Sequence, residues 1–152
     1  MIVKSIVWPN EDATQAFAKT LAAQPGLGNA FIELRGDLGA GKTTFVRHLL
    51  GALGVQGRIK SPTYAVVEPY ELSKGLNIWH FDFYRFNDPD EWEEAGFREL
   101  FASPGLKLVE WAAHAGPHIP QADLVIAIDT IDSDARSVTL TTMTDTGARL
   151  LP

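Results

Sequence analysis

The spacing of apolar residues along the chain predicts alternating strands and helices. Residues 31–35 alternate apolar and polar positions, as in a half-buried strand, and residues 44–50 then carry apolar residues at helical spacing. Residues 10–24 place Phe17 and Leu21 on one face, which predicts an amphipathic helix. The first half of the chain therefore has the strand, loop and helix order of an α/β protein.

The ends of these two helices carry recognisable signals. Asn10 is a suitable N-cap for the first helix, because its side-chain oxygen can accept a hydrogen bond from a backbone N–H of the first turn. The second helix is expected to end near Gly54, since glycine readily adopts the left-handed conformation that closes many helices.

The second half of the chain predicts two hairpins and one further strand. Residues 64–82 contain two strand-like stretches separated by a polar turn, so they are expected to form a hairpin. Residues 106–111 form an apolar strand with a carboxylate, Glu110, near its end. Residues 122–129 and 136–142 predict a second hairpin that completes the sheet.

Composition narrows the class of protein. The chain has 152 residues, 45% of them hydrophobic and 21% charged, and no apolar run approaches the roughly 20 residues of a membrane span. Its N-terminus lacks the long apolar block of a signal peptide. We therefore expect one soluble, cytoplasmic domain over residues 1–152, with no membrane partner. The absence of cysteine excludes disulfides, thiol catalysis and cysteine-ligated zinc.

Charge and histidine content remove two further classes of site. With 13 Lys and Arg against 19 Asp and Glu, the net charge of −6 argues against a broad nucleic-acid-binding face, although a local basic patch stays possible. The four histidines are expected to be surface residues rather than metal ligands: His48, His80, His114 and His118.

One stretch, Gly36 to Thr43, matches the phosphate-loop pattern G-x-x-x-x-G-K-S/T at every required position. Its glycines let the loop curl so that backbone N–H groups face phosphate oxygens at the positive end of the following helix. Lys42 would reach the terminal phosphates, and the Thr43 hydroxyl would bind magnesium. The residues expected to bind the nucleotide here are Gly36, Asp37, Leu38, Gly39, Ala40, Gly41, Lys42, Thr43 and Thr44.

The phosphate loop, set between a strand and a helix, indicates the fold class. We expect an α/β, P-loop NTPase-like three-layer sandwich with a mostly parallel central sheet and antiparallel additions.

Two carboxylates, Asp82 and Glu110, stand at the ends of predicted strands. Phosphoryl transfer depends on charge neutralisation and positioning, so one carboxylate would bind magnesium beside Thr43 and the other would order the attacking water. Spacing alone leaves open which does which. Period-two geometry also predicts that His80, Asp82 and Tyr84 share one strand face, which favours a functional cluster.

Two features allow both a structural and a functional interpretation. The turn Ser61-Pro62-Thr63-Tyr64 is either an ordinary proline turn or a nucleotide-sensing switch loop. Thr14, near the start of the first helix, is more simply a solvated helix residue than a ligand contact.

Four motifs occurring in this order resemble those of the TsaE (YjeE) family: Gly36 to Thr43, Ser61 to Tyr64, His80 to Arg85 and Val109-Glu110-Trp111-Ala112. The resemblance covers nearly the whole chain. It implies that Lys42 and Thr43 contact phosphate and magnesium, that Asp82 is a magnesium-associated carboxylate, and that Glu110 is the Walker B-like acid; the implied catalytic set is Lys42, Asp82 and Glu110.

The same resemblance assigns roles to residues that the pattern alone leaves open. It implies that Thr14 lies at the nucleotide base, that Thr63 belongs to the switch loop, and that Trp111 is the aromatic residue after the Walker B-like acid. The chain departs from the family pattern at Ala13, where an acidic residue is usual, and in the segment 92–96.

The family resemblance implies a magnesium-dependent ATPase required for threonylcarbamoyladenosine modification of tRNA, at the adenosine next to the anticodon. It would hydrolyse ATP to ADP slowly alone and productively with TsaB and TsaD, touching tRNA mainly indirectly through that complex. Two alternatives remain at this point: a small-molecule P-loop kinase, and a nucleotide-gated binding module in which hydrolysis is incidental.

Overall fold

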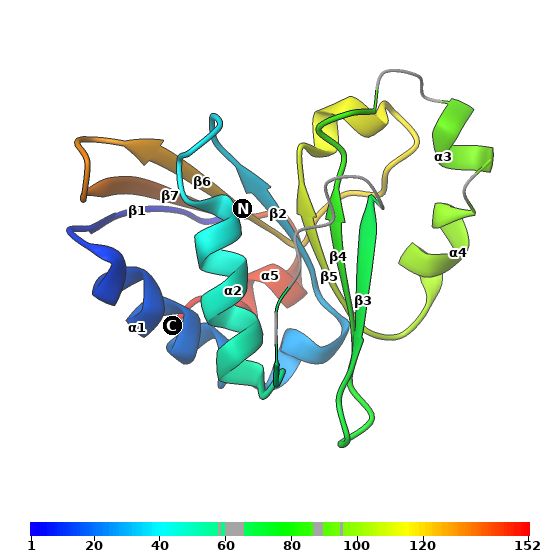
Figure 1. Ribbon diagram of the computed structural model, residues 1–152, viewed down its shortest axis with the longest axis horizontal. Helices are drawn as coiled ribbons and strands as arrows, with labels where there is room; N and C mark the ends of the chain where they lie inside the picture. The colour runs from blue at the N-terminus through cyan, green and yellow to red at the C-terminus, as the bar shows by residue number, and fades with distance from the viewer. Residues whose placement is uncertain (58, 60–65, 87–89, 95) are drawn as a thin grey trace.

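A mixed seven-stranded sheet forms the centre of the computed structural model, which describes residues 1–57, 59, 66–86, 90–94 and 96–152 (Figure 1). The spatial order of the strands is β1-β7-β6-β2-β5-β4-β3. Their bounds are β1 (Val3–Trp8), β2 (Phe31–Arg35), β3 (Val67–Glu71), β4 (Asn77–Asp82), β5 (Leu106–Glu110), β6 (Leu124–Thr130) and β7 (Arg136–Thr142). The four central strands run parallel, while β1, β7 and β3 are joined by antiparallel pairing.

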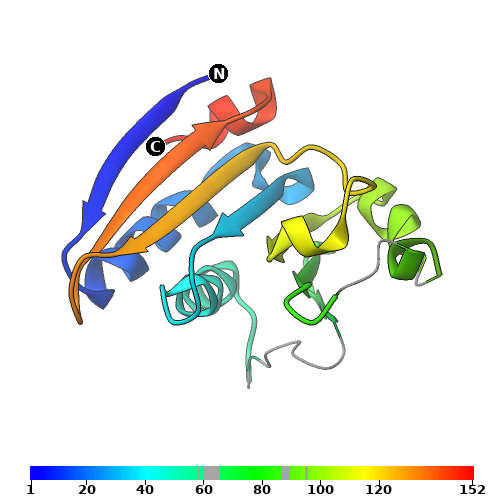
Figure 2. The same cartoon turned by 90° about the horizontal axis from the view of Figure 1, so that it is seen from above.

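Helices pack on both faces of this sheet (Figure 2). They are α1 (Glu11–Ala22), α2 (Lys42–Leu53), α3 (Asp90–Glu94), α4 (Phe97–Ala102) and α5 (Asp145–Leu150), with 3-10 helices η1 (Pro25–Asn29) and η2 (Ala112–Ala115). Neighbouring residues of β5 show the two faces, because Leu108 packs in the core with Leu49 of α2, whereas Val109 packs with Trp92 of α3. The predicted α/β class, with a parallel centre and antiparallel additions, is confirmed.

The predicted helix signals are also confirmed. The Asn10 side chain accepts a hydrogen bond from the Ala13 N–H at 3.0 Å, and Gly54 closes α2 with a φ of 100°. Both predicted hairpins form, as β3 with β4 and as β6 with β7. Helix α5 and the two 3-10 helices were not predicted. In the described part of the chain, no helix is long and apolar enough to cross a membrane.

The parallel strands bring three distant segments to one edge of the sheet. In the strand register, Leu34 of β2 lies across from Glu110 of β5, and Glu110 lies across from Asp82 of β4. The loop that begins at Gly36 leaves β2 at this same edge and leads into α2. The carboxyl ends of neighbouring parallel strands are where open α/β sheets commonly bind ligands.

Candidate functional site

The loop between β2 and α2 has a shape that depends on glycine. Gly36, Gly39 and Gly41 have φ values of 151°, 80° and 113°. A Cβ on Gly36 would lie 2.5 Å from the carbonyl oxygen of Ile128, so that position also requires a close backbone approach. Among the described residues no side chain caps the start of α2, so its first N–H groups face an open end.

Lys42, the first residue of α2, turns back over this loop. Only 5% exposed, it donates a hydrogen bond from Nζ to the carbonyl oxygen of Gly36. Nζ also lies 3.8 Å from the centroid of the Trp111 ring, which is a cation–π contact. Burial lowers the pKa of Lys42, an effect opposed by the charges of Glu110, Asp82 and Asp37. The ammonium group is therefore held inside the site.

Trp111 connects the end of β5 to η2 in a left-handed conformation, with a φ of 59°. Its ring centroid lies 5.0 Å from that of Tyr84 and 5.2 Å from that of His114. A non-glycine residue at positive φ carries backbone strain, and in this conformation the indole ring of Trp111 lies against the Lys42 ammonium group.

Glu110 is the most buried carboxylate of this edge, 2% exposed. The hydroxyl of Thr43 lies 3.1 Å from Glu110 Oε1 and 3.3 Å from Oε2. On its other side, Nε2 of His80 lies 2.6 Å from Glu110 Oε2. The expectation that His80 is a surface residue is wrong: it is 1% exposed, because its position in β4 directs it toward the α2 side of the sheet.

Asp82 ends β4 beside Glu110 but is only partly buried. Its Oδ1 accepts a hydrogen bond from the Tyr84 N–H at 3.0 Å. Burial raises the pKa of Asp82 and the nearby Glu110 adds to the rise, whereas the Tyr84 N–H, His80 and Lys42 oppose it. Tyr84 itself lies in a turn beyond the strand rather than on the strand face with His80 and Asp82, because β4 ends at Asp82.

A cavity of ≈ 380 Å³ connects the glycine loop with the two carboxylates. It is lined by Leu38, Gly39, Gly41, Lys42, Thr43, Thr44, Asp82, Tyr84, Arg85, Glu110 and Trp111. The topology thus brings together most residues that the sequence predicted for phosphate and metal. Of the described loop residues, Gly36, Asp37 and Ala40 lie outside this lining, Gly36 because it lies close to the backbone of Ile128 at the loop's base.

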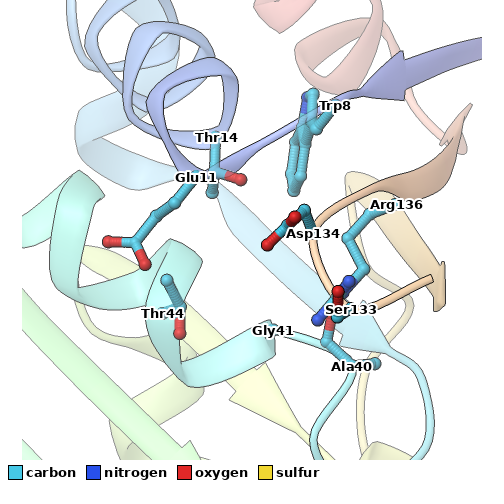
Figure 3. A pocket seen from close by; sticks show the side chains of 9 residues that line it. All are labelled: Trp8, Glu11, Thr14, Ala40, Gly41, Thr44, Ser133, Asp134 and Arg136. Carbon is cyan, nitrogen blue, oxygen red and sulfur yellow. The ribbon is translucent and has the colours of Figure 1, made fainter. Parts of the chain in front are cut away.

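A second cavity of ≈ 140 Å³ adjoins the first and shares Gly41 and Thr44 with it (Figure 3). Glu11, Thr14 and Thr44 line one side, and Trp8, Ser133, Asp134 and Arg136 line the other, with Ala40 and Gly41 below them (Figure 3). Thr14 is 6% exposed, so it is a lining residue rather than a solvated one. The interpretation of Thr14 as a solvated helix residue is therefore wrong. Its contact with a nucleotide base stays a prediction.

Arg136 ties the glycine loop to β7, and the sequence did not single it out. Its Nε donates to the carbonyl oxygen of Ala40 at 2.7 Å, and its Nη1 donates to the carbonyls of Asp132 at 2.9 Å and Ala135 at 3.0 Å. The Asp132 carboxylate accepts from the N–H groups of Asp134 and Ala135, which shapes the β6–β7 turn. This turn thereby forms a fixed wall of the second cavity.

The predicted switch residues Ser61, Pro62, Thr63 and Tyr64 lie outside the described residues, so their role stays a prediction. For Trp111, the other predicted switch residue, the structure gives a position in the cavity lining.

The donor set at this site fits magnesium bound together with a nucleotide. Within the described residues, no group of three His, Cys, Asp or Glu side chains is arranged to hold a metal ion. Magnesium, however, keeps several waters and typically takes one or two carboxylates plus substrate phosphates. The Thr43 hydroxyl against the Glu110 carboxylate, with Asp82 alongside, supplies oxygen ligands of that kind.

Comparison with known proteins gives consistent similarities. The family described as threonylcarbamoyl adenosine biosynthesis protein TsaE matches residues 8–138. The chain is 43% identical over 120 residues to the tRNA threonylcarbamoyladenosine biosynthesis protein TsaE of Haemophilus influenzae, covering 79% of this chain and 75% of that protein. It is 38% identical to the protein of the same name from Bacillus subtilis over 141 residues, or 91% and 87% of the two chains.

A solved structure is similar over almost the full length. The crystal structure of Bacillus subtilis YdiB superposes with a TM-score of 0.72 at 34% sequence identity, covering 99% of this chain and 93% of that chain.

Proposed function

Because the chain belongs to the TsaE family of threonylcarbamoyl adenosine biosynthesis proteins, we propose that it is the magnesium-dependent ATPase subunit of tRNA threonylcarbamoyladenosine modification. The relatives named above are tRNA threonylcarbamoyladenosine biosynthesis proteins, which supports the proposed role in that modification of tRNA. One observation carries the ATPase assignment: the Thr43 hydroxyl at the start of α2 lies 3.1 Å from the buried Glu110 carboxylate, behind a glycine loop.

The two adjoining cavities would hold the two ends of one nucleotide. The larger cavity, with Lys42, Thr43 and the open start of α2, suits phosphate groups, since N–H groups and the helix dipole favour negative charge there. The smaller cavity, with Trp8 and Thr14, suits the base and ribose, because it combines an aromatic wall with polar groups. Gly41 and Thr44 belong to both linings, so the nucleotide would pass over them.

Four polar side chains of the larger cavity have roles that follow from their positions. Lys42 would exchange its hydrogen bond to the Gly36 carbonyl for the terminal phosphates. Thr43 and Glu110 would hold magnesium, Thr43 directly and Glu110 directly or through water, because their oxygens already lie together. A bound magnesium ion would supply neutralisation of the phosphate charge. Asp82, more exposed than Glu110, would order the attacking water.

Partners would complete the catalytic arrangement. We propose that the protein acts in the cytoplasm with TsaB and TsaD, is weakly active alone, and meets tRNA mainly through that complex. A site whose lysine is engaged by Gly36 and Trp111 suits a nucleotide switch, since binding must rearrange those contacts. Ser61 to Tyr64 and Trp111 are the proposed moving parts.

The decisive assay is ATP turnover by the protein alone, with TsaB, with TsaD and with both. We expect slow turnover alone and clear stimulation in the complete mixture, together with formation of threonylcarbamoyladenosine in tRNA. Turnover that stays the same in every combination would contradict the proposal, and a phosphorylated small molecule in a substrate screen would favour a kinase instead.

A further inference from the structure

We propose that His80 is a positioning residue for the Glu110 carboxylate, an inference that rests on the function proposed above. His80 lies in β4 and Glu110 ends the neighbouring strand β5, so the two side chains come from adjacent strands of the parallel centre. His80 would touch neither nucleotide nor metal. It would act by fixing the direction in which Glu110 presents its oxygens to Thr43.

The hydrogen bond between the two side chains is short and shielded from water. Nε2 of His80 and Oε2 of Glu110 are 2.6 Å apart, slightly shorter than the roughly 2.7–2.9 Å of most charge-assisted bonds from nitrogen, and both residues are buried. Because an ionised carboxylate can only accept hydrogen bonds, a bond to ionised Glu110 requires Nε2 of His80 to carry the hydrogen and donate the bond. In a site from which water is excluded, such a bond restricts rotation of the carboxylate strongly.

The environment of Nδ1, the other ring nitrogen, indicates that the bond to Glu110 is the main polar contact of the His80 side chain. Nδ1 is buried and has no hydrogen-bond partner in the described part of the structure. Buried polar atoms are normally paired, so an unpaired Nδ1 is a cost that the position tolerates. A purely structural role would be met by an apolar residue on this strand. Within the described residues, the hydrogen bond to Glu110 is the polar contact that explains a histidine at this position.

Glu110 is thereby held from two sides. His80 contacts Oε2, while the Thr43 hydroxyl lies 3.1 Å from Oε1 and 3.3 Å from Oε2. The carboxylate is directed at the start of α2, where the proposed magnesium site lies. Misplacement of a catalytic group by about 1 Å can reduce a rate about 100-fold, so this restraint has a measurable consequence.

Two amide variants of His80 test whether its hydrogen bond to Glu110 matters, or only the volume of its side chain. In His80→Gln the side-chain amide nitrogen reaches the place of Nε2 and can donate to Glu110, whereas in His80→Asn it reaches only the place of Nδ1. We expect His80→Gln to retain turnover with TsaB and TsaD within about 3-fold, and His80→Asn to lose about 10- to 100-fold, as outer-shell partners of metal ligands do.

Two readouts do not depend on turnover. Calorimetry of ADP binding with and without magnesium should show that His80→Asn loses the magnesium-dependent gain in affinity and that His80→Gln keeps it. Nitrogen NMR of the wild-type protein should show a hydrogen on Nε2 of His80, the ring nitrogen that faces Glu110. This second measurement requires no variant, so it remains decisive if His80→Asn fails to fold.

Three results would overturn the inference: a wild-type His80 ring unprotonated at Nε2, equal turnover in the wild type and both amide variants, or an equal magnesium effect on ADP affinity in all three. The failure of the proposed function is distinguishable, because ATP turnover by the wild-type protein itself would then be the same in every partner combination.

Discussion

Asp82 and Glu110 lie directly across from each other in the register of the neighbouring parallel strands β4 and β5, but their environments differ. Glu110 is buried and held by His80 and Thr43, whereas Asp82 is partly exposed to the cavity and accepts a backbone N–H. A carboxylate held on two sides suits a fixed metal-directed role, and a more exposed one suits exchange with water. The sequence could not distinguish the two; the contacts favour this division.

Replacing Glu110 with glutamine tests whether its charge is needed for hydrolysis. Glu110→Gln keeps the size of the side chain but removes the negative charge beside Thr43, so we expect turnover with TsaB and TsaD to fall about 100-fold or more while ADP still binds. Glu99→Gln, which changes an exposed carboxylate of α4, should have no effect. If Glu110→Gln abolished hydrolysis but left tRNA fully modified, the protein would be a nucleotide-gated binding module.

The two buried lysines of the described chain make a matched pair for nucleotide binding. The pKa of each lysine is lowered by burial. Lys42 lines the larger cavity, whereas Lys107 lies near the start of β5, away from Glu110 at the strand's end, and donates to the Ser103 carbonyl. We expect Lys42→Met to weaken ATP binding by about 10- to 100-fold, the value of one charge-assisted hydrogen bond. Calorimetry on Lys107→Met should give the wild-type affinity, and unchanged affinity in Lys42→Met would contradict the role of Lys42.

Local signals in the sequence were sufficient for the glycine loop and the secondary structure around it. The strand before the loop, the N-cap at Asn10 and the end of α2 at Gly54 all depend on residues near one another in the chain. The two carboxylates were found for a similar reason, since each ends an apolar strand. Helix α5, which has six residues, lacks a long periodic pattern and was missed.

The smaller cavity could not be predicted because its wall is assembled from both ends of the chain. Trp8 ends β1, whereas Ser133, Asp134 and Arg136 follow β6, and the two segments meet only through the pairing of β1 with β7. In the sequence, Ser133 and Asp134 are an ordinary polar turn and Arg136 is a single basic residue. His80 was misjudged for the same reason: it is buried against Glu110 of the neighbouring strand β5, a contact that no local pattern shows.

The raised pKa of Asp82 predicts a pH-dependent gain in stability for Asp82→Asn. Burial keeps the folded-state pKa above its ordinary value of 3.8, so the folded protein holds this proton to higher pH than the unfolded chain. Ionised Asp82 therefore costs stability at neutral pH. We expect metal-free Asp82→Asn to gain less than about 1 kcal/mol at pH 7 in urea denaturation, and the gain to vanish below pH 3.8.

Asp132→Asn is the control of opposite sign for this pH experiment. The N–H groups of Ala135 and Asp134 lower the pKa of Asp132, so its ionised form stabilises the folded protein. Asp132→Asn should therefore be slightly less stable than the wild type at neutral pH, and the difference should shrink as pH falls through the folded-state pKa. A loss of stability at neutral pH in Asp82→Asn would contradict the raised pKa of Asp82.

Gly36 and Gly39 belong to one motif, but replacing each with alanine should affect different properties: mainly stability at Gly36 and mainly ATP affinity at Gly39. At Gly36 the new Cβ would lie 2.5 Å from the Ile128 carbonyl oxygen and 3.0 Å from the Ala40 Cβ, in addition to the strain of positive φ. Backbone strain would cost about 1–2 kcal/mol and overpacking about 1–3 kcal/mol. We therefore expect the free energy of unfolding of Gly36→Ala to be about 3 kcal/mol lower than that of the wild type. Thermal unfolding should then shift down by about 6–12 °C.

At Gly39 no described atom lies within 4 Å of an added Cβ, and only the strain of its φ of 80° opposes alanine. Gly39→Ala should therefore cost about 1 kcal/mol of stability. Gly39 lines the cavity, however, so the methyl group would enter the space proposed for phosphates, and ATP affinity should fall while the protein stays folded. Gly36 would then be needed for the stability of the loop, and Gly39 for the binding of ATP. Equal unfolding temperatures for the two variants would contradict this separation, because the close approach of Ile128 occurs at Gly36 and not at Gly39.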